Sequence, residues 1–467
     1  MRSFLADLVI GFNYFVLFHY GFVNLIYTAL LVISTLDILR HITRIRYAPF
    51  KDFAASPETP PVSVLVPAYN EEDVIVRTVR ATLEMNYPDF EVIVINDGST
   101  DKTLDKLIQT FKLGKVDRVY RNVLKTTPIR SFYFNPEIPN LLVVDKENSG
   151  KSDSLNCGIN ISGAPYFCTV DADSVPEENA LIKLMTPVIE SIVPVVACGG
   201  VIRALNGVKL ENGKLSNIDL PKSRLAMFQV AEYIRAFLFG RVGLSAVKSI
   251  LILSGAFSLF RKDAIIEIGG YRKGNISEDM ELVTRLHRVS IEKKVPYSIQ
   301  FISDPVCWTE VPEDMKMLAR QRRRWYLGLM QTLVHNRDTL FRPKYGRFGW
   351  ICLPYYVIVE LLSPLIEMLG YIIVPISWAF GMLNTEFMIL FLTLSIFFGI
   401  FLSTASIYLE EVTYRRYPKW KHLARLLLYG VLENFGYRQI NSFWRFEAFL
   451  KYIFGKRKWE YVRKGSH

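Results

Sequence analysis

The chain has 467 residues, of which 50% are hydrophobic and 13% aromatic, and its mean hydropathy is +0.19. This composition excludes a disordered protein and is unusual for a soluble enzyme, so we expect part of the chain to lie in lipid. The formal net charge of +11 at pH 7 would suit a nucleic-acid partner, but basic residues that flank membrane helices explain it better, and we expect no nucleic acid.

The first expected element is a membrane-spanning helix from Leu8 to Thr35, a run without Asp, Glu, Lys or Arg. At about 1.5 Å per residue this run can cross a hydrocarbon core of about 30 Å. It is too long for a signal peptide, and it is not followed by an A-x-A cleavage site. Because Arg40, Arg44 and Arg46 follow it, the positive-inside rule places the next part of the chain in the cytoplasm.

After the linker Ser56-Pro57-Glu58-Thr59-Pro60-Pro61, short apolar runs rich in β-branched residues alternate with helical patterns. The runs are Val62–Val66, Glu91–Asn96, Leu141–Asp145 and Tyr166–Val170. This alternation predicts an α/β domain with a mostly parallel sheet covered on both faces. Ligands of such sheets bind beyond the carboxyl ends of the strands, so the residues after each run form the candidate site.

Two motifs after these runs exclude familiar nucleotide sites. Asn148-Ser149-Gly150-Lys151-Ser152 resembles the end of a P-loop, but Asp145 stands where that motif needs its first glycine. The first run leads into Pro67-Ala68-Tyr69-Asn70-Glu71 rather than a glycine-rich turn, which excludes a dinucleotide site for hydride transfer. Lys151 remains a candidate for binding a phosphate or for a structural ion pair.

Acidic residues in two further motifs are candidates for metal binding and catalysis. Asp171 and Asp173 follow the fourth run and point to the same side of the chain. Such a pair suits Mg²⁺ or Mn²⁺ bridging to phosphate oxygens, although a turn or helix cap is an equally good interpretation of this motif alone. Ser277-Glu278-Asp279 opens a predicted helix from Met280 to Arg288, where Asp279 is either a cap or a general base.

The motif Gln321-Arg322-Arg323-Arg324-Trp325 lies on a predicted helix from about Asp314 to His335. A basic run on a helix is most often a solvated surface. Alternatively, Arg324 and Trp325 could clamp a diphosphate and present an aromatic face to a sugar.

A second apolar zone follows this helix. We predict an interfacial amphipathic helix at 348–361, a span at 363–383 and a third span from Phe387 to Leu409. Glu367 is expected to face protein or a polar lumen rather than lipid. The remaining tail closes with Lys456-Arg457-Lys458 and is expected to lie on the cytoplasmic face.

Taken together and in order, these motifs resemble the membrane-embedded family 2 glycosyltransferases, which include cellulose, hyaluronan and poly-N-acetylglucosamine synthases. The matching segments are PAYNEE (67–72), NDGSTD (96–101), ENSGKSDSLNCG (147–158), DADS (171–174), SGAF (254–257), SEDMEL (277–282) and QRRRW (321–325). The resemblance implies a GT-A-type, Rossmann-like glycosyltransferase domain inserted between transmembrane helices. The expected divisions are a helix and basic flank (1–50), the cytoplasmic catalytic domain (51–345), an interfacial helix with two transmembrane helices (346–410) and a cytoplasmic-face tail (411–467).

The resemblance also implies a role for each matching residue. The positions that match the uridine-binding residues are Ala68, Tyr69, Glu71 and Asp97. The positions that match residues near the nucleotide and its diphosphate are Lys151, Asp171, Gln321 and Arg324. Asp173 matches the ligand of Mg²⁺ or Mn²⁺, and Asp279 matches the catalytic base, with Glu278 beside it. The acceptor-binding positions are Ser254, Gly255 and Trp325.

The implied activity is inverting transfer from a UDP-sugar, either UDP-glucose or UDP-N-acetylglucosamine, to a growing β-linked glycan. A multi-pass protein of the plasma (inner) membrane would carry it out in the lipid bilayer, with the catalytic domain in the cytoplasm. Three spans are fewer than translocating members usually have. Either the interfacial segments at 348–361 and 424–455 help to line a pore, or a small membrane partner or a second copy completes a channel. The alternatives are a non-processive transferase acting on a lipid acceptor and a non-catalytic membrane receptor or assembly subunit. The inserts near 113–140 and 203–222 receive no role.

Overall fold

The computed structural model of the protein describes residues 2–47, 59–211 and 213–454. Half of the predicted linker (Ser56 to Glu58) and the terminal Lys456-Arg457-Lys458 lie outside these residues. The described chain forms two compact units. We call residues 39–221 and 250–311 the sheet unit, and residues 2–38, 222–249 and 312–454 the helical unit.

The sheet unit is built on a ten-stranded mixed sheet with the strand order β3-β4-β5-β2-β1-β6-β11-β8-β12-β7. The strands are β1 (Val62–Ala68), β2 (Phe90–Asn96), β3 (Gly114–Val116), β4 (Ile129–Phe134), β5 (Leu141–Lys146), β6 (Tyr166–Val170), β7 (Ser174–Pro176), β8 (Val195–Ala204), β11 (Phe257–Arg261) and β12 (Ser298–Thr309). The four strands predicted from the sequence are confirmed as β1, β2, β5 and β6, which pair in parallel.

The prediction of a mostly parallel sheet holds for this central block and for β8 with β12, which also pair in parallel, but not for the other pairs of neighbouring strands. Strand β11 is antiparallel to both β6 and β8, and β3, β4 and β7 also pair antiparallel with their neighbours. An antiparallel neighbour needs no helical crossover between the strands. The alternation of strands and helices along the chain therefore does not fix the direction of these strands.

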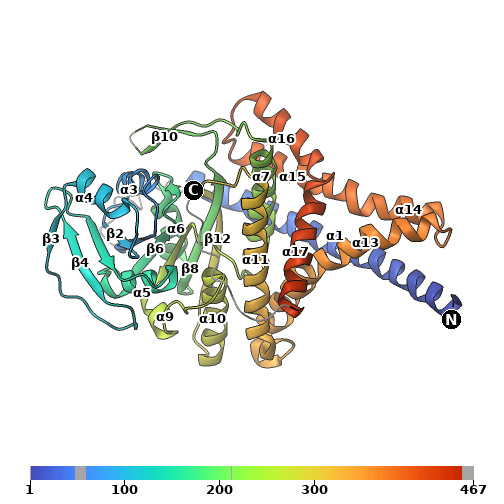
Figure 1. The fold of residues 1–467 in the computed structure, drawn as a ribbon, viewed down its shortest axis with the longest axis horizontal. Helices are drawn as coiled ribbons and strands as arrows, with labels where there is room; N and C mark the ends of the chain where they lie inside the picture. Colours follow the sequence, from blue (N-terminus) through green and yellow to red (C-terminus); the bar gives the residue numbers. More distant parts are fainter. Residues whose placement is uncertain (1, 48–58, 212, 455–467) are drawn as a thin grey trace. The chain divides into compact units, whose positions relative to one another are not determined.

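Helices cover both faces of the sheet (Figure 1). The helices of this unit are α3 (Ile75–Leu83), α4 (Thr103–Phe111), α5 (Lys151–Ile161), α6 (Ala180–Glu190), α9 (Lys262–Glu267) and α10 (Glu278–Lys293). The step from β1 to β2 and the step from β5 to β6 run in opposite directions across the sheet. Right-handed crossovers therefore place α3 and α5 on opposite faces. The insert at 203–222 contains the hairpin of β9 (Lys209–Glu211) and β10 (Lys214–Asn217).

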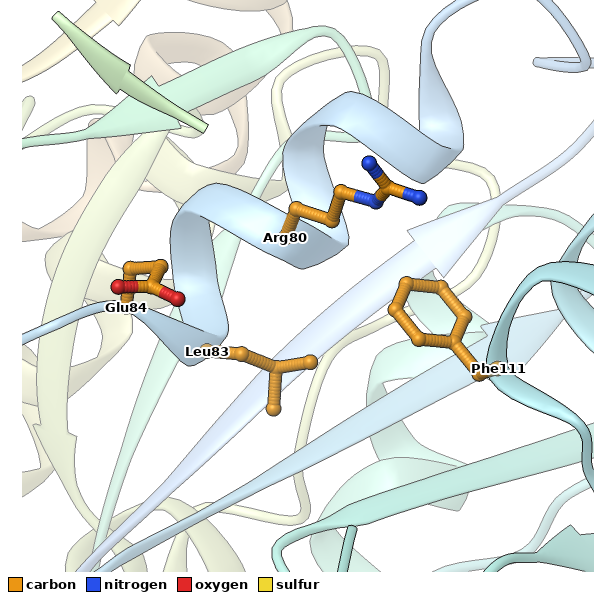
Figure 2. A pocket seen from close by; sticks show the side chains of 4 residues that line it. All are labelled: Arg80, Leu83, Glu84 and Phe111. Carbon is orange, nitrogen blue, oxygen red and sulfur yellow. The ribbon is translucent and has the colours of Figure 1, made fainter. Parts of the chain in front are cut away.

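A small open pocket of about 290 Å³ lies beside α3 and α4 (Figure 2). It is lined by Arg80, Leu83, Glu84 and Phe111. None of these residues belongs to the motifs that are predicted to bind substrate or to act in catalysis.

The helical unit contains the apolar helices. Its elements are α1 (Arg2–Tyr47, up to residue 38), α7 (Arg224–Ile234), η1 (Arg235–Arg241), α8 (Val242–Ala246), α11 (Met315–His335), η4 (Phe348–Cys352), α12 (Leu353–Tyr355), η5 (Tyr356–Leu362), α13 (Ser363–Ala379), α14 (Thr385–Leu392), η6 (Thr393–Phe397), α15 (Phe398–Thr413), α16 (Trp420–Leu432) and α17 (Tyr437–Phe454). In the described part of the chain, three helical stretches are long and apolar enough to cross a membrane: Ala6–Arg44, Phe348–Ala379 and Thr385–Thr413.

The second of these stretches differs from the sequence prediction. A break was expected near residue 362, but the structure is helical without interruption from Phe348 to Ala379, with π-helical turns at η4 and η5. Pro354 and Pro364 lack the backbone N–H that an α-helix uses, and such positions are often accommodated by local changes of helix type. The expectation for Glu367 is confirmed, because its Oε2 accepts a hydrogen bond from Ser442 of α17 at 3.3 Å.

A buried histidine fastens α10 to the rest of the sheet unit. The Nε2 of His287 donates to the carbonyl oxygen of Ile250 at 2.9 Å, and its Nδ1 accepts from the hydroxyl of Tyr297 at 2.9 Å. Since a carbonyl can only accept, the neutral imidazole carries its proton on Nε2. Burial lowers the pKa of His287 from its usual 6.5 to about 4, although the bond to Ile250 opposes that shift.

The lowered pKa of His287 predicts a loss of stability in mild acid. The folded state holds this histidine neutral, so its contribution is complete above pH 6.5 and is lost as the pH falls toward 4. At pH 5 the cost is about 2 kcal/mol, or roughly 4–8 °C in Tm. Thermal unfolding at pH 7.5 and 5.0 should show a smaller pH effect in His287→Gln than in wild type, and an equal effect in both would contradict this assignment.

Candidate active site

The carboxyl ends of the four parallel strands bring the predicted motifs to one edge of the sheet. Ala68 ends β1, Asp97 follows β2, Lys146 ends β5 and Asp171 follows β6. The direction of the chain across the sheet reverses between β1 and β6. In open α/β sheets, this switch point is where ligands bind.

The loop after β1 is tied to the loop after β2. The hydroxyl oxygen of Ser99 accepts from the N–H of Asn70 at 3.0 Å, and Asn70 Oδ1 accepts from the N–H of Thr100 at 2.8 Å. Asn70 has a φ of 54°, a left-handed conformation that asparagine tolerates better than most residues. These bonds fix the turn that carries Tyr69 and Glu71, both half-buried.

The buried carboxylate of Asp97 organises the loop after β5. Its Oδ1 accepts from Lys146 Nζ at 2.7 Å and from the N–H of Ser149 at 3.1 Å, and its Oδ2 accepts from the N–H of Gly150 at 2.7 Å. The structure therefore shows that Asp97 holds the protein's own backbone in place. Its contact with uridine stays a prediction.

Lys146 is a residue that the sequence analysis missed. It is completely buried, and its Nζ lies 2.7 Å from Asp97 Oδ1 and 2.9 Å from Asp153 Oδ2. Burial would raise the pKa of Asp153, but bonds from Lys273, Thr127 and Lys146 lower it to about 2. A lysine that directly ends an apolar strand, next to a motif, is the signal that could have revealed this ion pair.

A second lysine joins the two acidic motifs. Lys151 is the first residue of α5, and its Nζ lies 2.5 Å from Asp171 Oδ1 and 3.1 Å from Glu278 Oε1. Burial opposes its charge, but the carboxylates of Asp171 and Glu278 outweigh burial and raise the pKa of Lys151 above its ordinary value. A fixed positive charge therefore sits between the DADS motif and the SED motif.

Gly255 marks the point where these groups converge. A Cβ atom at this position would lie 3.2 Å from Lys151 Nζ, 3.8 Å from Asp171 Oδ2 and 3.8 Å from Asp279 Oδ2. The donor-side acid and the predicted base therefore face the same small space. The other oxygen of Asp279, Oδ1, accepts from the N–H of Met280 at 2.8 Å.

Ser254 shapes the turn that carries Gly255. Its Oγ accepts from the N–H of Ala256 at 3.2 Å, and its carbonyl oxygen accepts from Ser258 Oγ at 2.7 Å. The carbonyl of Ala256 in turn accepts from the N–H of Asp171 at 3.2 Å. The predicted acceptor-side turn and the predicted donor-side acid are thus joined by a backbone hydrogen bond.

The oxygens near β6 fit a divalent ion that also binds phosphate. Across the described ranges, no group of three or more His, Cys, Asp or Glu side chains could hold a metal ion by itself. Mg²⁺ is commonly bound by one or two carboxylates together with substrate phosphates, so a third protein ligand is not required. Lys151 engages Asp171 Oδ1 at 2.5 Å, and Asp173 stays the predicted ligand of the ion.

The QRRRW motif lies on α11, in the helical unit. Arg322 is buried, donates to Glu232 Oε2 at 2.7 Å and stacks 4.6 Å from the ring centroid of Trp325, so its role is structural. Arg324 is exposed, and Trp325 is 41% exposed. The closing of Gln321, Arg324 and Trp325 over a diphosphate stays a prediction.

Comparisons with known proteins agree with this geometry. Residues 63–269 match the family model described as Glycosyl transferase family 2. The chain is 29% identical over 359 residues to a probable glycosyltransferase, YdaM, of Bacillus subtilis (strain 168), which covers 73% of this chain and 75% of that protein. It is also 29% identical over 304 residues to the poly-β-1,6-N-acetyl-D-glucosamine synthase of Staphylococcus aureus (strain MSSA476), which covers 64% of this chain and 62% of that synthase.

Among solved structures, the chain is similar to the mannosyltransferase PcManGT from Pyrobaculum calidifontis, determined in complex with GDP-Man and Mn²⁺. The TM-score is 0.50 at 18% identity, over 89% of this chain and 99% of that chain, and this likeness shows the fold. The fold and the site define a glycosyltransferase with a GT-A-like sheet. The match over residues 63–269 and the two relatives support the resemblance to family 2 glycosyltransferases, and the sequence predictions of this fold class and of a hexosyltransferase enzyme are confirmed.

The space around Gly255 predicts the effect of adding one methyl group. Gly255→Ala should force Lys151 Nζ to move by a few tenths of an ångström, which is cheap for a flexible side chain, so the protein should fold normally. Because Lys151 joins both acidic motifs, we expect UDP release to slow by roughly 10- to 100-fold. Gly163→Ala, where the added Cβ would meet only Glu91 Oε1 at 3.6 Å, is the control and should keep wild-type turnover.

Proposed function

We propose that this protein is an inverting, metal-dependent glycosyltransferase that uses UDP-glucose or UDP-N-acetylglucosamine to elongate a β-linked polysaccharide at the membrane. The observation that carries the proposal is the convergence of Lys151, Asp171 and Asp279 on the space beside Gly255. The synthase name of the staphylococcal relatives supports a glycan product.

On the donor side, Tyr69, Glu71 and Asp97 border the expected place of the uridine, beyond β1 and β2. Asp173, with Asp171 beside it, would hold Mg²⁺ or Mn²⁺. When bound, that ion would neutralise the negative charge that develops on the leaving diphosphate. Lys151 adds a fixed positive charge next to the same acids.

On the acceptor side, Asp279 acts as the base. Its Oδ2 faces the space beside Gly255 and accepts the proton of the acceptor hydroxyl as that oxygen bonds to the anomeric carbon. The bond from this carbon to the diphosphate breaks in the same step, so the configuration inverts. Glu278, 3.1 Å from Lys151 Nζ, fixes the start of α10 and so orients Asp279.

The membrane part of the proposal comes from the helical unit. Three helices long and apolar enough to cross a bilayer agree with a multi-pass protein of the plasma membrane, with the catalytic domain 51–345 in the cytoplasm. Gln321, Arg324 and Trp325 would close over the diphosphate and line the acceptor site. A small membrane partner or a second copy of the chain would complete a channel for the growing glycan.

Two substitutions separate the base from the metal ligand. Asp279→Asn should keep UDP binding but lower turnover by about 10²–10⁴, since a positioned base contributes about that much. Asp173→Ala should lose both turnover and its response to Mg²⁺ or Mn²⁺. Isothermal titration with UDP and a UDP-release assay measure both effects. Asp263→Asn, at a side chain that is 72% exposed, is the control, and normal turnover by Asp279→Asn would sink the base assignment.

The product decides between the proposed function and its alternatives. Detergent-purified protein is incubated with Mg²⁺ or Mn²⁺ and each UDP-sugar, and the product is sized on a gel and digested with linkage-specific hydrolases. We expect a β-linked polymer. A single sugar on a lipid would instead show a non-processive transferase, and no UDP release with any donor would favour a receptor or assembly subunit.

A further inference from the structure

One face of α5 carries three buried polar side chains. Asp153, Asn156 and Asn160 are spaced three and four residues apart, so they lie on the same side of the helix. Asp153 bonds Thr127 and Asn160 bonds the backbone of Leu124, both in the segment 122–127, and Asp153 also pairs with Lys273. Of the three, Asn156 is the one that hydrogen-bonds the backbone of the turn Ile268–Tyr271.

The side-chain amide of Asn156 forms two hydrogen bonds with the backbone of Tyr271. Its Nδ2 donates to the carbonyl of Tyr271 at 2.8 Å, and its Oδ1 accepts from the N–H of Tyr271 at 2.7 Å. Both residues are 4% exposed. The neighbouring Gly270 has a φ of +69°, and a Cβ there would lie 2.4 Å from Asn156 Oδ1, so the turn is built around this amide.

The same turn is held from the other side by the helix that carries the base. Arg285, on α10, donates from Nη2 to the carbonyl of Gly270 at 2.8 Å and from Nη1 to the carbonyl of Ile268. Its guanidinium is itself held by Glu281, with bonds of 2.8 Å and 2.7 Å to the two carboxylate oxygens. The turn Ile268–Tyr271 therefore connects α5 to α10.

These contacts join the two catalytic helices at two places. At the reacting end, Lys151 at the start of α5 bonds Glu278 at the start of α10. Behind it, Asn156 and Arg285 clamp the turn Ile268–Tyr271 between the same helices. Two attachments along rigid helices restrict both the distance and the angle between them, which one flexible lysine could not do.

We propose that Asn156 and Arg285 are positioning residues that hold the base Asp279 at a fixed distance from the donor site through the turn Ile268–Tyr271. The inference rests on the proposed function, because it takes Asp279 as the base. Loss of the amide would leave the buried N–H and C=O of Tyr271 without this partner, and the turn would shift to find others. A displacement of about 1 Å at a reacting group is enough to cost roughly 100-fold in rate.

The test compares Asn156→Ala with Asn160→Ala. Both remove a buried amide from the same face of α5, but only the first loosens the turn before the base. In the full-length protein, we expect Asn156→Ala to lower kcat by about 10- to 100-fold while the KM for the UDP-sugar and the Kd for UDP stay within about threefold. Asn160→Ala should keep kcat within about threefold. Equal losses of kcat in the two variants, or a raised KM with unchanged kcat in Asn156→Ala, would overturn the inference.

Hydrogen exchange supplies a readout that does not depend on turnover. Asn156→Ala should speed exchange in residues 268–282, whereas Asn160→Ala should speed exchange near residues 122–126. Unchanged exchange at 268–282 in Asn156→Ala would overturn the inference even if no donor is turned over. If wild type releases no UDP while the exchange pattern is as expected, only the proposed function fails.

Milder variants keep the test decisive if Asn156→Ala does not fold. Arg285→Lys keeps the positive charge and can reach one carbonyl of the turn, whereas Arg285→Met loses both contacts. We expect kcat to fall in the order wild type, Arg285→Lys, Arg285→Met, with the Kd for UDP unchanged. A purely structural role would lower Tm in both variants without this order in kcat.

Discussion

The ion pairs of Lys151 are the contacts on which the rest of the site depends. This one ammonium group bonds Asp171, at the end of β6, and Glu278, at the start of α10. Without it, the carboxylates of two acidic motifs would face each other across a small space and repel. The cation therefore allows the acidic motif after β6 and the acidic motif at the start of α10 to lie next to each other, which the proposed transfer between a diphosphate and a hydroxyl requires.

The way the backbone around Lys151 is held explains why this lysine can bond both acidic motifs. Lys151 is the first residue of α5, and the loop before it is fixed by the carboxylate of Asp97, which is itself held by the buried Lys146. Asn156, further along α5, secures the turn that leads to α10. The predicted donor and acceptor sides of the site are thus both supported by α5, so we expect a change in this helix to affect both sides.

Much of the fold and the site could be read from the sequence. Local patterns of hydrophobic and β-branched residues predict the four central strands, the two helices that begin near Glu278 and Met315, and the three apolar stretches. The direction of the antiparallel strands could not be predicted in this way, because it depends on which strands become neighbours in the sheet. The sequence also did not predict that the helix from Phe348 to Ala379 is uninterrupted, because a proline can either end a helix or be accommodated within it.

The sequence by itself indicated a glycosyltransferase, because the order and type of residues in its motifs resemble those of the family 2 enzymes. Only the tertiary structure decided which side chains support that chemistry. Lys146 bonds Asp97, Asn156 bonds Tyr271 and Arg285 bonds Gly270, and each of these partners is distant in sequence. Such partners meet only when the domain is assembled, so a local pattern can mark a residue such as Lys146 but cannot name its partner.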